Sequence, residues 1–206
     1  MRSVYRSVSL IDKSNINYIR HCNKMAADRS INRHIAEPDS KRLITSWLEL
    51  SLIKHFSQQY TFEKKNILTW EELNIYNIYI RKFSELDAVF STINSNLYME
   101  IKASLSKSNL RRGKDQIDKN LQLIRRINSN FSAQLIMADC RCFDKSFGYN
   151  KDEIVELMQE SNQYALIEGL EGQETIPPPK SLLILNEADV LNLAARFGPP
   201  IEDYIL

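Results

Sequence analysis

Asp87, Glu100 and Lys102 are spaced so that a β-hairpin would bring their side chains together. If Ser91–Asn96 form the loop of this hairpin, Asp87 lies opposite Glu100 on the neighbouring strand. Because side chains alternate between the two faces of a strand, Lys102 lies on the same face as Glu100. Two opposed carboxylates repel each other unless a cation lies between them, and divalent metals such as Mg²⁺ prefer carboxylate oxygens. A lysine ammonium beside such a metal could hold a water molecule or a phosphate oxygen.

The two runs that carry these residues resemble the core motif of the PD-(D/E)XK nuclease superfamily. They are Glu85-Leu86-Asp87-Ala88-Val89-Phe90 and Glu100-Ile101-Lys102-Ala103-Ser104, with Leu86 where the family motif has proline. The resemblance implies a restriction-endonuclease-like core, in which a helix packs on a mixed sheet and these residues lie on its second and third strands. It implies that Asp87, Glu100 and the carbonyl of Ile101 bind Mg²⁺ or Mn²⁺. By the same resemblance Lys102 orients the attacking water.

The resemblance assigns roles to further residues on two helices. Many members of the superfamily add a glutamate from the helix before the sheet, and Glu49 occupies that position. Others carry a glutamine or lysine on the helix after the motif, where Gln116 and Lys114 stand. A phosphate would meet that helix near its N-terminus. The implied catalytic residues are therefore Asp87, Glu100, Lys102, Glu49 and Gln116, with Glu49 as a further metal ligand.

An ordinary hairpin is the alternative interpretation of the same residues. The register that pairs Phe90 with Leu97 also places Glu85 opposite Lys102. These two side chains could form a cross-strand ion pair on a solvent face, with no metal involved. Tyr98 on the second strand fits strand packing better than base stacking.

The order of elements around the motif predicts an α/β fold, a mixed β-sheet flanked by helices. A helix over Lys41–Ser57 is apolar around most of its circumference, which is typical of a helix buried against a sheet. Three strands, a second helix and a buried strand follow it. These five elements are expected at Asn74–Ile80, Phe83–Phe90, Leu97–Ala103, Lys114–Ile127 and Ala133–Cys140.

The composition divides the chain into three parts. A basic N-terminal segment, 1–40, predicts loops with a short helix. The nuclease-like core spans 41–149 and includes an irregular polar stretch over 60–70. An acidic C-terminal helical extension, 150–206, predicts four features. They are a helix over Lys151–Ser161, a stiff linker over 171–179, a short strand over Ser181–Leu185 and a helix that starts near Asn186.

The formal net charge of +1 conceals an uneven distribution of charge. Residues 1–149 carry 24 Lys and Arg against 15 Asp and Glu, whereas residues 150–206 carry 3 against 11. A basic body predicts nucleic acid as a partner. The acidic part predicts a protein partner or a cover over the basic site. Four basic side chains just after the motif are expected to contact phosphates. They are Lys107, Arg111, Arg112 and Lys114.

Several classes of protein do not fit this composition. No apolar run is long enough to span a membrane, and the N-terminus lacks the apolar segment of a secretory signal. The three cysteines, Cys22, Cys140 and Cys142, match neither a disulfide framework nor a zinc site. We therefore expect reduced thiols in a cytoplasmic protein.

These features together predict a Mg²⁺-dependent endonuclease that acts on DNA. A non-catalytic nucleic-acid-binding or assembly module with the same fold is one alternative. Another is an RNA endonuclease of the cap-snatching type, which needs a metal-binding histidine near the first helix, where His55 is the only candidate. Cutting both strands of a duplex would require a homodimer or two successive cuts.

Overall fold

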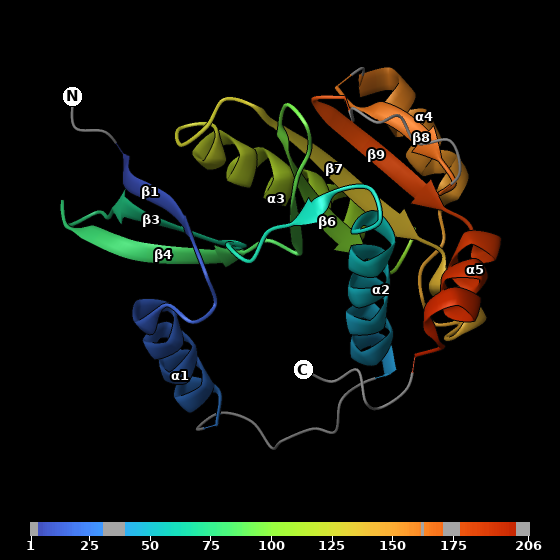
Figure 1. Ribbon diagram of the computed structural model, residues 1–206, viewed down its shortest axis with the longest axis horizontal. Helices are drawn as coiled ribbons and strands as arrows, with labels where there is room; N and C mark the ends of the chain where they lie inside the picture. The colour runs from blue at the N-terminus through green and yellow to red at the C-terminus, as the bar shows by residue number, and fades with distance from the viewer. Residues whose placement is uncertain (1–3, 31–39, 162, 171–177, 201–206) are drawn as a thin grey trace.

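One stretch of chain crosses from a small β-sheet into a larger one (Figure 1), and Asp87 lies at the crossing. Strand β4 (Tyr79–Glu85) belongs to the small sheet and β5 (Ala88–Ser91) to the large one. The structure is a computed structural model that describes residues 4–30, 40–161, 163–170 and 178–200. Leu86 and Asp87 are the two residues between the strands, so the expected single strand over Phe83–Phe90 is interrupted at the candidate site.

The large sheet has six strands in the order β2-β5-β6-β7-β9-β8. Strands β2, β5 and β6 pair antiparallel, whereas β6, β7, β9 and β8 pair parallel, so the sheet is mixed as the sequence predicts. Every residue of β7 is buried, which is typical of a central strand covered on both faces. Besides β5, the strands of this sheet are β2 (Thr61–Phe62), β6 (Asn96–Lys102), β7 (Phe131–Ala138), β8 (Ala165–Glu168) and β9 (Lys180–Leu185).

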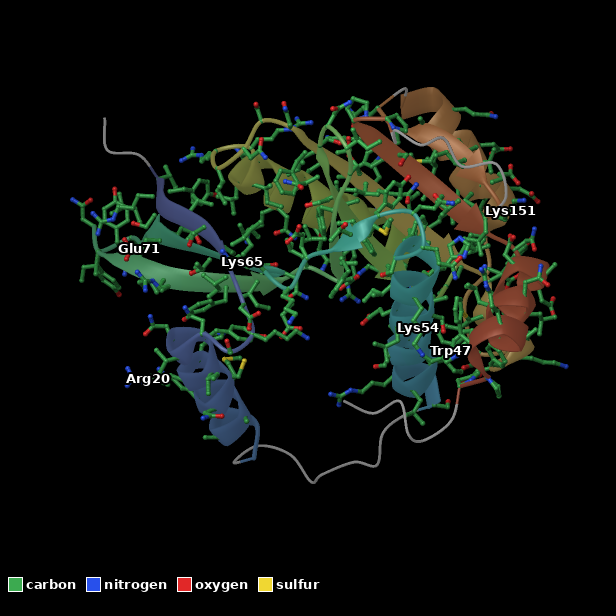
Figure 2. The ribbon with its side chains drawn as sticks, in the orientation of Figure 1. Arg20, Trp47, Lys54, Lys65, Glu71 and Lys151 are labelled. Atoms are coloured by element: carbon green, nitrogen blue, oxygen red, sulfur yellow. The ribbon has the colours of Figure 1, made fainter. Side chains whose placement is uncertain are left out.

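Helices cover both faces of the large sheet, which confirms the expected α/β class. On one face α2 (Ser40–Phe56) and α5 (Glu187–Phe197) share an apolar layer with the sheet. The opposite face carries α3 (Lys107–Ile124) and α4 (Lys151–Ser161). Trp47 of α2 is fully buried, and its indole N–H donates to the carbonyl of Gly198, which follows α5 (Figure 2).

The small sheet is antiparallel, in the order β1-β3-β4, and packs beside α3. Strand β1 covers Tyr5–Ile11, β3 covers Ile67–Leu73, and helix α1 (Ile16–Ser30) follows β1. In Figure 1 this sheet and α1 lie to the left of α2, which crosses in front of the large sheet. Residues 1–40 therefore contribute a strand and a helix to the fold where loops and one short helix were expected. Of that segment, residues 1–3 and 31–39 lie outside the described residues.

Two expectations around the small sheet are wrong. The run Asn74–Ile80 is largely the turn between β3 and β4, because the side chain of Asn74 accepts from the backbone N–H groups of Tyr76 and Ile78. The apolar side chains of this turn point to solvent, with Ile75 91% exposed. The third strand of the sheet is instead β3, most of which lies in the stretch expected to be irregular.

The remaining expectations differ mainly at element boundaries. Helix α4 has the expected bounds; α2, β6 and β7 differ from theirs by one or two residues at each end, and β9 begins one residue early and ends at Leu185 as expected. Helix α3 begins at Lys107 rather than Lys114, because the hydroxyl of Ser106 accepts from the N–H of Asn109 and caps the helix. The segment 150–206 adds two strands, β8 and β9, to the large sheet. Most of the expected linker, 171–177, lies outside the described residues.

Candidate metal and phosphate site

Asp87 is held at the crossing between the two sheets by hydrogen bonds on either side of it. The backbone N–H of Leu86 donates to the carbonyl of Asn66, and the Asn66 side chain donates back to the carbonyl of Leu86. Asn66 is buried, so these bonds fix the bend in which the chain leaves the small sheet. Beyond the bend, the backbone N–H of Ile101 donates to Oδ2 of Asp87 at 2.7 Å. The carboxylate is thereby tied to the neighbouring strand.

The hairpin has the register that the sequence predicts. Phe90 pairs with Leu97 and Ala88 with Met99, so the next residues outward are Asp87 and Glu100. Lys102 lies on the same face as Glu100, and its ammonium donates to Oε1 of that carboxylate. Glu100 is 1% exposed and Lys102 15% exposed, which makes this an ion pair of the interior.

The expected pairing of Glu85 with Lys102 is wrong. Glu85 ends β4 and pairs with Ile67 in the small sheet, because the chain changes sheets before it reaches Asp87. The carboxylate of Glu85 accepts instead from the hydroxyl of Tyr18 on α1. The ordinary-hairpin interpretation of the motif, which depended on this cross-strand ion pair, loses its main contact.

Two residues that support Glu100 were missed by the sequence analysis. The hydroxyl of Tyr98 donates to Oε2 of Glu100 at 2.5 Å, and the side-chain amide of Asn120 donates to the Tyr98 oxygen at 3.0 Å. Both side chains are at most 2% exposed. Tyr98 could have been found, because the two-residue period of a strand puts it on the face of Glu100 and Lys102. Nothing in the sequence distinguishes Asn120 from other polar residues of its helix.

The acidic side chains of the site act on one another's ionisation. Burial raises the pKa of Asp87 well above its usual range, and the charges of Glu100 and Glu49 raise it further. Burial also raises the pKa of Glu49, with a smaller contribution in the same direction from Glu100 and opposing ones from Lys102 and Lys13. Burial and the charges of the two glutamates thus disfavour a negative charge on Asp87; Glu49, Asp87 and Glu100 are hereafter the carboxylate cluster.

The carboxylate oxygens of the cluster are suitable ligands for a hard divalent cation such as Mg²⁺. Asp87 keeps Oδ1, and Glu49 keeps both carboxylate oxygens, without a hydrogen bond to any described residue. As the side chains stand, no three His, Cys, Asp or Glu residues within the described ranges are grouped tightly enough to enclose a metal. Mg²⁺ does not require such a cage, because it commonly takes one or two carboxylates and keeps several waters. Asp87 and Glu100 would be the two carboxylates of such a site.

An open pocket of about 510 Å³, hereafter the Asp87 pocket, adjoins the carboxylate cluster. Glu49 and Asp87 line it together with residues from the β1–α1 turn, α2, β2 and the β2–β3 segment. Lys13 and Lys64 are its basic members, and neither is among the site residues expected from the sequence. The volume is within the range of pockets that bind small ligands.

The basic residues expected to contact phosphates lie along the first turns of α3. Arg111 and Arg112 are exposed, whereas Lys107 pairs with Glu153 of α4 at 2.9 Å. The ammonium of Lys114 lies over the ring of Tyr164 at 5.5 Å. Two of the four cations are thus partly engaged by residues of the acidic segment.

Gln116 and His55 do not contact the carboxylate cluster through any described hydrogen bond. The side-chain oxygen of Gln116 is buried and has no partner among the described residues. Gln116 lies one helical turn from Asn120, which supports Glu100 through Tyr98. His55 lies beside Arg196 of α5, and burial together with that charge lowers its pKa. The structure therefore gives no support to His55 as a metal ligand.

Comparisons with known proteins identified no relative of this chain. No protein-family model, no curated protein and no solved structure matches the chain. Among the described residues no helix has the length and apolar character needed to cross a membrane.

Proposed function

We propose that this chain is a metal-dependent nuclease with a restriction-endonuclease-like core. The observation that carries the proposal is the position of Asp87 and Glu100 directly after the last residues paired in the β5–β6 hairpin, with Lys102 bound to Glu100 and a pocket that Asp87 lines. A buried carboxylate next to other carboxylates lowers the free energy of unfolding unless a cation compensates its charge, so such an arrangement favours a functional role. Sites with strongly shifted pKa values in a pocket are frequently functional.

The roles of the residues follow from their positions. Asp87, Glu100 and the carbonyl of Ile101 would hold Mg²⁺ or Mn²⁺, and Glu49 would add a carboxylate from α2. Bound there, the metal supplies a Lewis acid and a water of lowered pKa. The ammonium of Lys102, which donates to Glu100, would reorient to donate to the attacking water or to a phosphate oxygen. Tyr98 and Asn120 would keep the Glu100 carboxylate in place during that change.

Substrate binding would be largely electrostatic. Arg111 and Arg112 are exposed near the start of α3, and Lys13 and Lys64 are exposed beside Asp87. Lys107 and Lys114 would join them if the substrate displaced Glu153 from Lys107 and the Tyr164 ring from Lys114. Such contacts predict affinity that falls steeply with salt, since each neutralised phosphate releases counterions. We propose DNA as the nucleic acid.

The test is cleavage of labelled DNA with Mg²⁺, with Mn²⁺ and with EDTA. Wild type should cut with either metal and not with EDTA. Asp87→Asn and Lys102→Ala should each lower the rate at least ~100-fold, because removal of one group that contacts the reacting atoms typically costs that much. Asp152→Asn, an exposed substitution on α4, is the matched control and should cut like wild type. Equal cleavage by all four proteins would overturn the assignment of this site.

A non-catalytic nucleic-acid-binding module is the second candidate. The observation that favours it is that both oxygens of Glu100 already have hydrogen-bond donors, from Tyr98 and Lys102. A module of this kind would shift the mobility of DNA without cutting it, and Asp87→Asn would leave that shift unchanged.

A further inference from the structure

The side chains that line the Asp87 pocket are of two chemical kinds. Leu50 and Ile53 of α2 and Phe62 of β2 are apolar, and we refer to them as the apolar wall. The lining also includes two basic residues, Lys13 and Lys64. Phosphate alone would bind the lysines and gain nothing from the apolar wall. The pocket is therefore suited to a ligand with both an apolar and an anionic part.

The apolar wall is a firm surface that remains partly open to solvent. Leu50 and Ile53 are three residues apart on α2 and therefore lie on one face of the helix. Phe62 packs edge-on against the buried ring of Phe90, with 5.6 Å between the ring centroids. Phe62 is partly exposed, as are both aliphatic residues. An aromatic ring braced in this way is the usual platform for an unpaired base.

The two lysines are available to a ligand. Lys13 follows β1 and Lys64 follows β2, both are exposed, and neither forms an ion pair with another described residue. The other acidic residues of the pocket are already engaged locally. Asp12 accepts from the backbone N–H of Ser14, and Glu85 accepts from Tyr18. The two ammonium groups are therefore available to bind phosphates of a ligand in the pocket.

We infer that the Asp87 pocket accepts one unstacked nucleotide next to the phosphate that is cut, so that the substrate is single-stranded nucleic acid. The base lies against Leu50, Ile53 and Phe62, and Lys13 and Lys64 contact its flanking phosphates. A base inside a duplex is stacked and paired, so it must leave the helix before it can occupy this wall. The inference rests on the proposed nuclease function and specifies its substrate.

The experiment compares cleavage of one labelled strand, alone and in a blunt duplex, at equal Mg²⁺ and salt. The single strand should be cut with a kcat/KM at least ~10-fold higher than the duplex. Phe62→Ala should lower kcat/KM on the single strand by about tenfold, and Phe62→Tyr should restore it, since tyrosine keeps the stacking ring. Lys64→Ala should also lower kcat/KM on the single strand, and because Lys64 is exposed this substitution leaves the fold intact. Arg20→Ala on α1, outside the pocket, is the control and should match wild type (Figure 2).

The outcomes separate this inference from the function on which it rests. Equal cleavage of single strand and duplex, with no loss in Phe62→Ala or Lys64→Ala, overturns the inference and leaves the nuclease proposal intact. If wild type cuts neither substrate, the nuclease proposal fails. Binding of fluorescent oligo(dT), measured in EDTA, then tests whether the Asp87 pocket binds single-stranded nucleic acid. Weaker binding by both variants then supports a single-strand site, and unchanged or absent binding overturns it.

Discussion

At the residue scale, Glu100 is held by a chain of side chains that ends in the interior of the protein. Asn120 donates to Tyr98, Tyr98 donates to Glu100, and Lys102 donates to the second oxygen of the same carboxylate. The position of Glu100 is therefore set by groups on two elements, β6 and α3. Such supporting contacts orient a metal ligand without touching the metal.

Tyr98→Phe tests this support. The substitution removes the donor to Glu100 and leaves the amide of Asn120 without its acceptor, which should destabilise the fold by about 1–3 kcal/mol. The Mg²⁺ concentration for half-maximal cleavage should rise about tenfold or more. Tyr76→Phe, in the exposed β3–β4 turn, is the matched control. An unchanged Mg²⁺ dependence in a folded Tyr98→Phe protein would contradict a supporting role.

The carboxylate cluster also predicts a pH dependence of stability. The pKa of Asp87 in the folded protein lies above that of the unfolded chain, so folding favours its protonated form. In metal-free protein this contribution is fully present below the ordinary pKa of aspartate and is lost as the pH rises through the raised pKa. Asp87→Asn keeps an acceptor for Ile101 and removes the charge.

Asp87→Asn should therefore raise the Tm of metal-free protein by roughly 2–4 °C at pH 8, where 1 kcal/mol corresponds to a shift of that size. The gain should shrink as the pH is lowered, and added Mg²⁺ should stabilise only the wild type. Thermal unfolding at several pH values with EDTA or Mg²⁺ measures both effects. A variant that is less stable than wild type at pH 8 would argue against an uncompensated charge at Asp87.

At the element scale, the hairpin could be predicted from the sequence and the sheet that precedes it could not. Loop length and side-chain alternation sufficed for the register of β5 and β6, because both are local properties. The crossing at Leu86 and Asp87 depends on Asn66, which is distant in the sequence, and no local pattern contains that information. For the same reason β3 was overlooked in a polar stretch, while the exposed isoleucines after it resembled a strand.

Helix α3 must approach β7 closely to place Asn120 beside Tyr98. Gly113 makes this approach possible, because a Cβ atom there would lie 2.5 Å from Cδ1 of Leu135, a fully buried residue. Gly113→Ala should gain about 0.5–1 kcal/mol from helix propensity and lose about 1–3 kcal/mol from overpacking. We expect net destabilisation, measured by urea unfolding. The exposed Asp115→Ala should change stability by less than about 0.5 kcal/mol, and a Gly113→Ala protein more stable than wild type would show that the helix can shift.

At the scale of the whole molecule, the acidic segment 150–206 is part of the large sheet. Strand β9 lies between β7 and β8, and Leu182, Leu183, Ile184 and Leu185 are all buried. The composition of the segment revealed its charge but not its place in the core. Two ion pairs join the segment to the body: Glu153 of the segment pairs with Lys107, and Lys180 of the segment pairs with Asp118 of the body.

Truncation after Tyr149 tests this placement. Loss of β8, β9 and α5 would expose one side of β7 and an apolar layer, so the fragment should aggregate or unfold without cooperativity. Circular dichroism and size-exclusion chromatography would measure this. A monomeric fragment with a cooperative melt would instead mean that the segment is an appendage.

We propose that a divalent metal binds at Asp87 and Glu100, and diffraction from crystals soaked in Mn²⁺ tests this most directly. We expect an anomalous diffraction peak between the carboxylates of Asp87 and Glu100 in wild type, with the Lys102 ammonium withdrawn from Glu100. The same soak of Asp87→Asn should give no peak there. A wild-type crystal saturated with Mn²⁺ that shows no peak at these carboxylates, or a peak only elsewhere, would contradict the account.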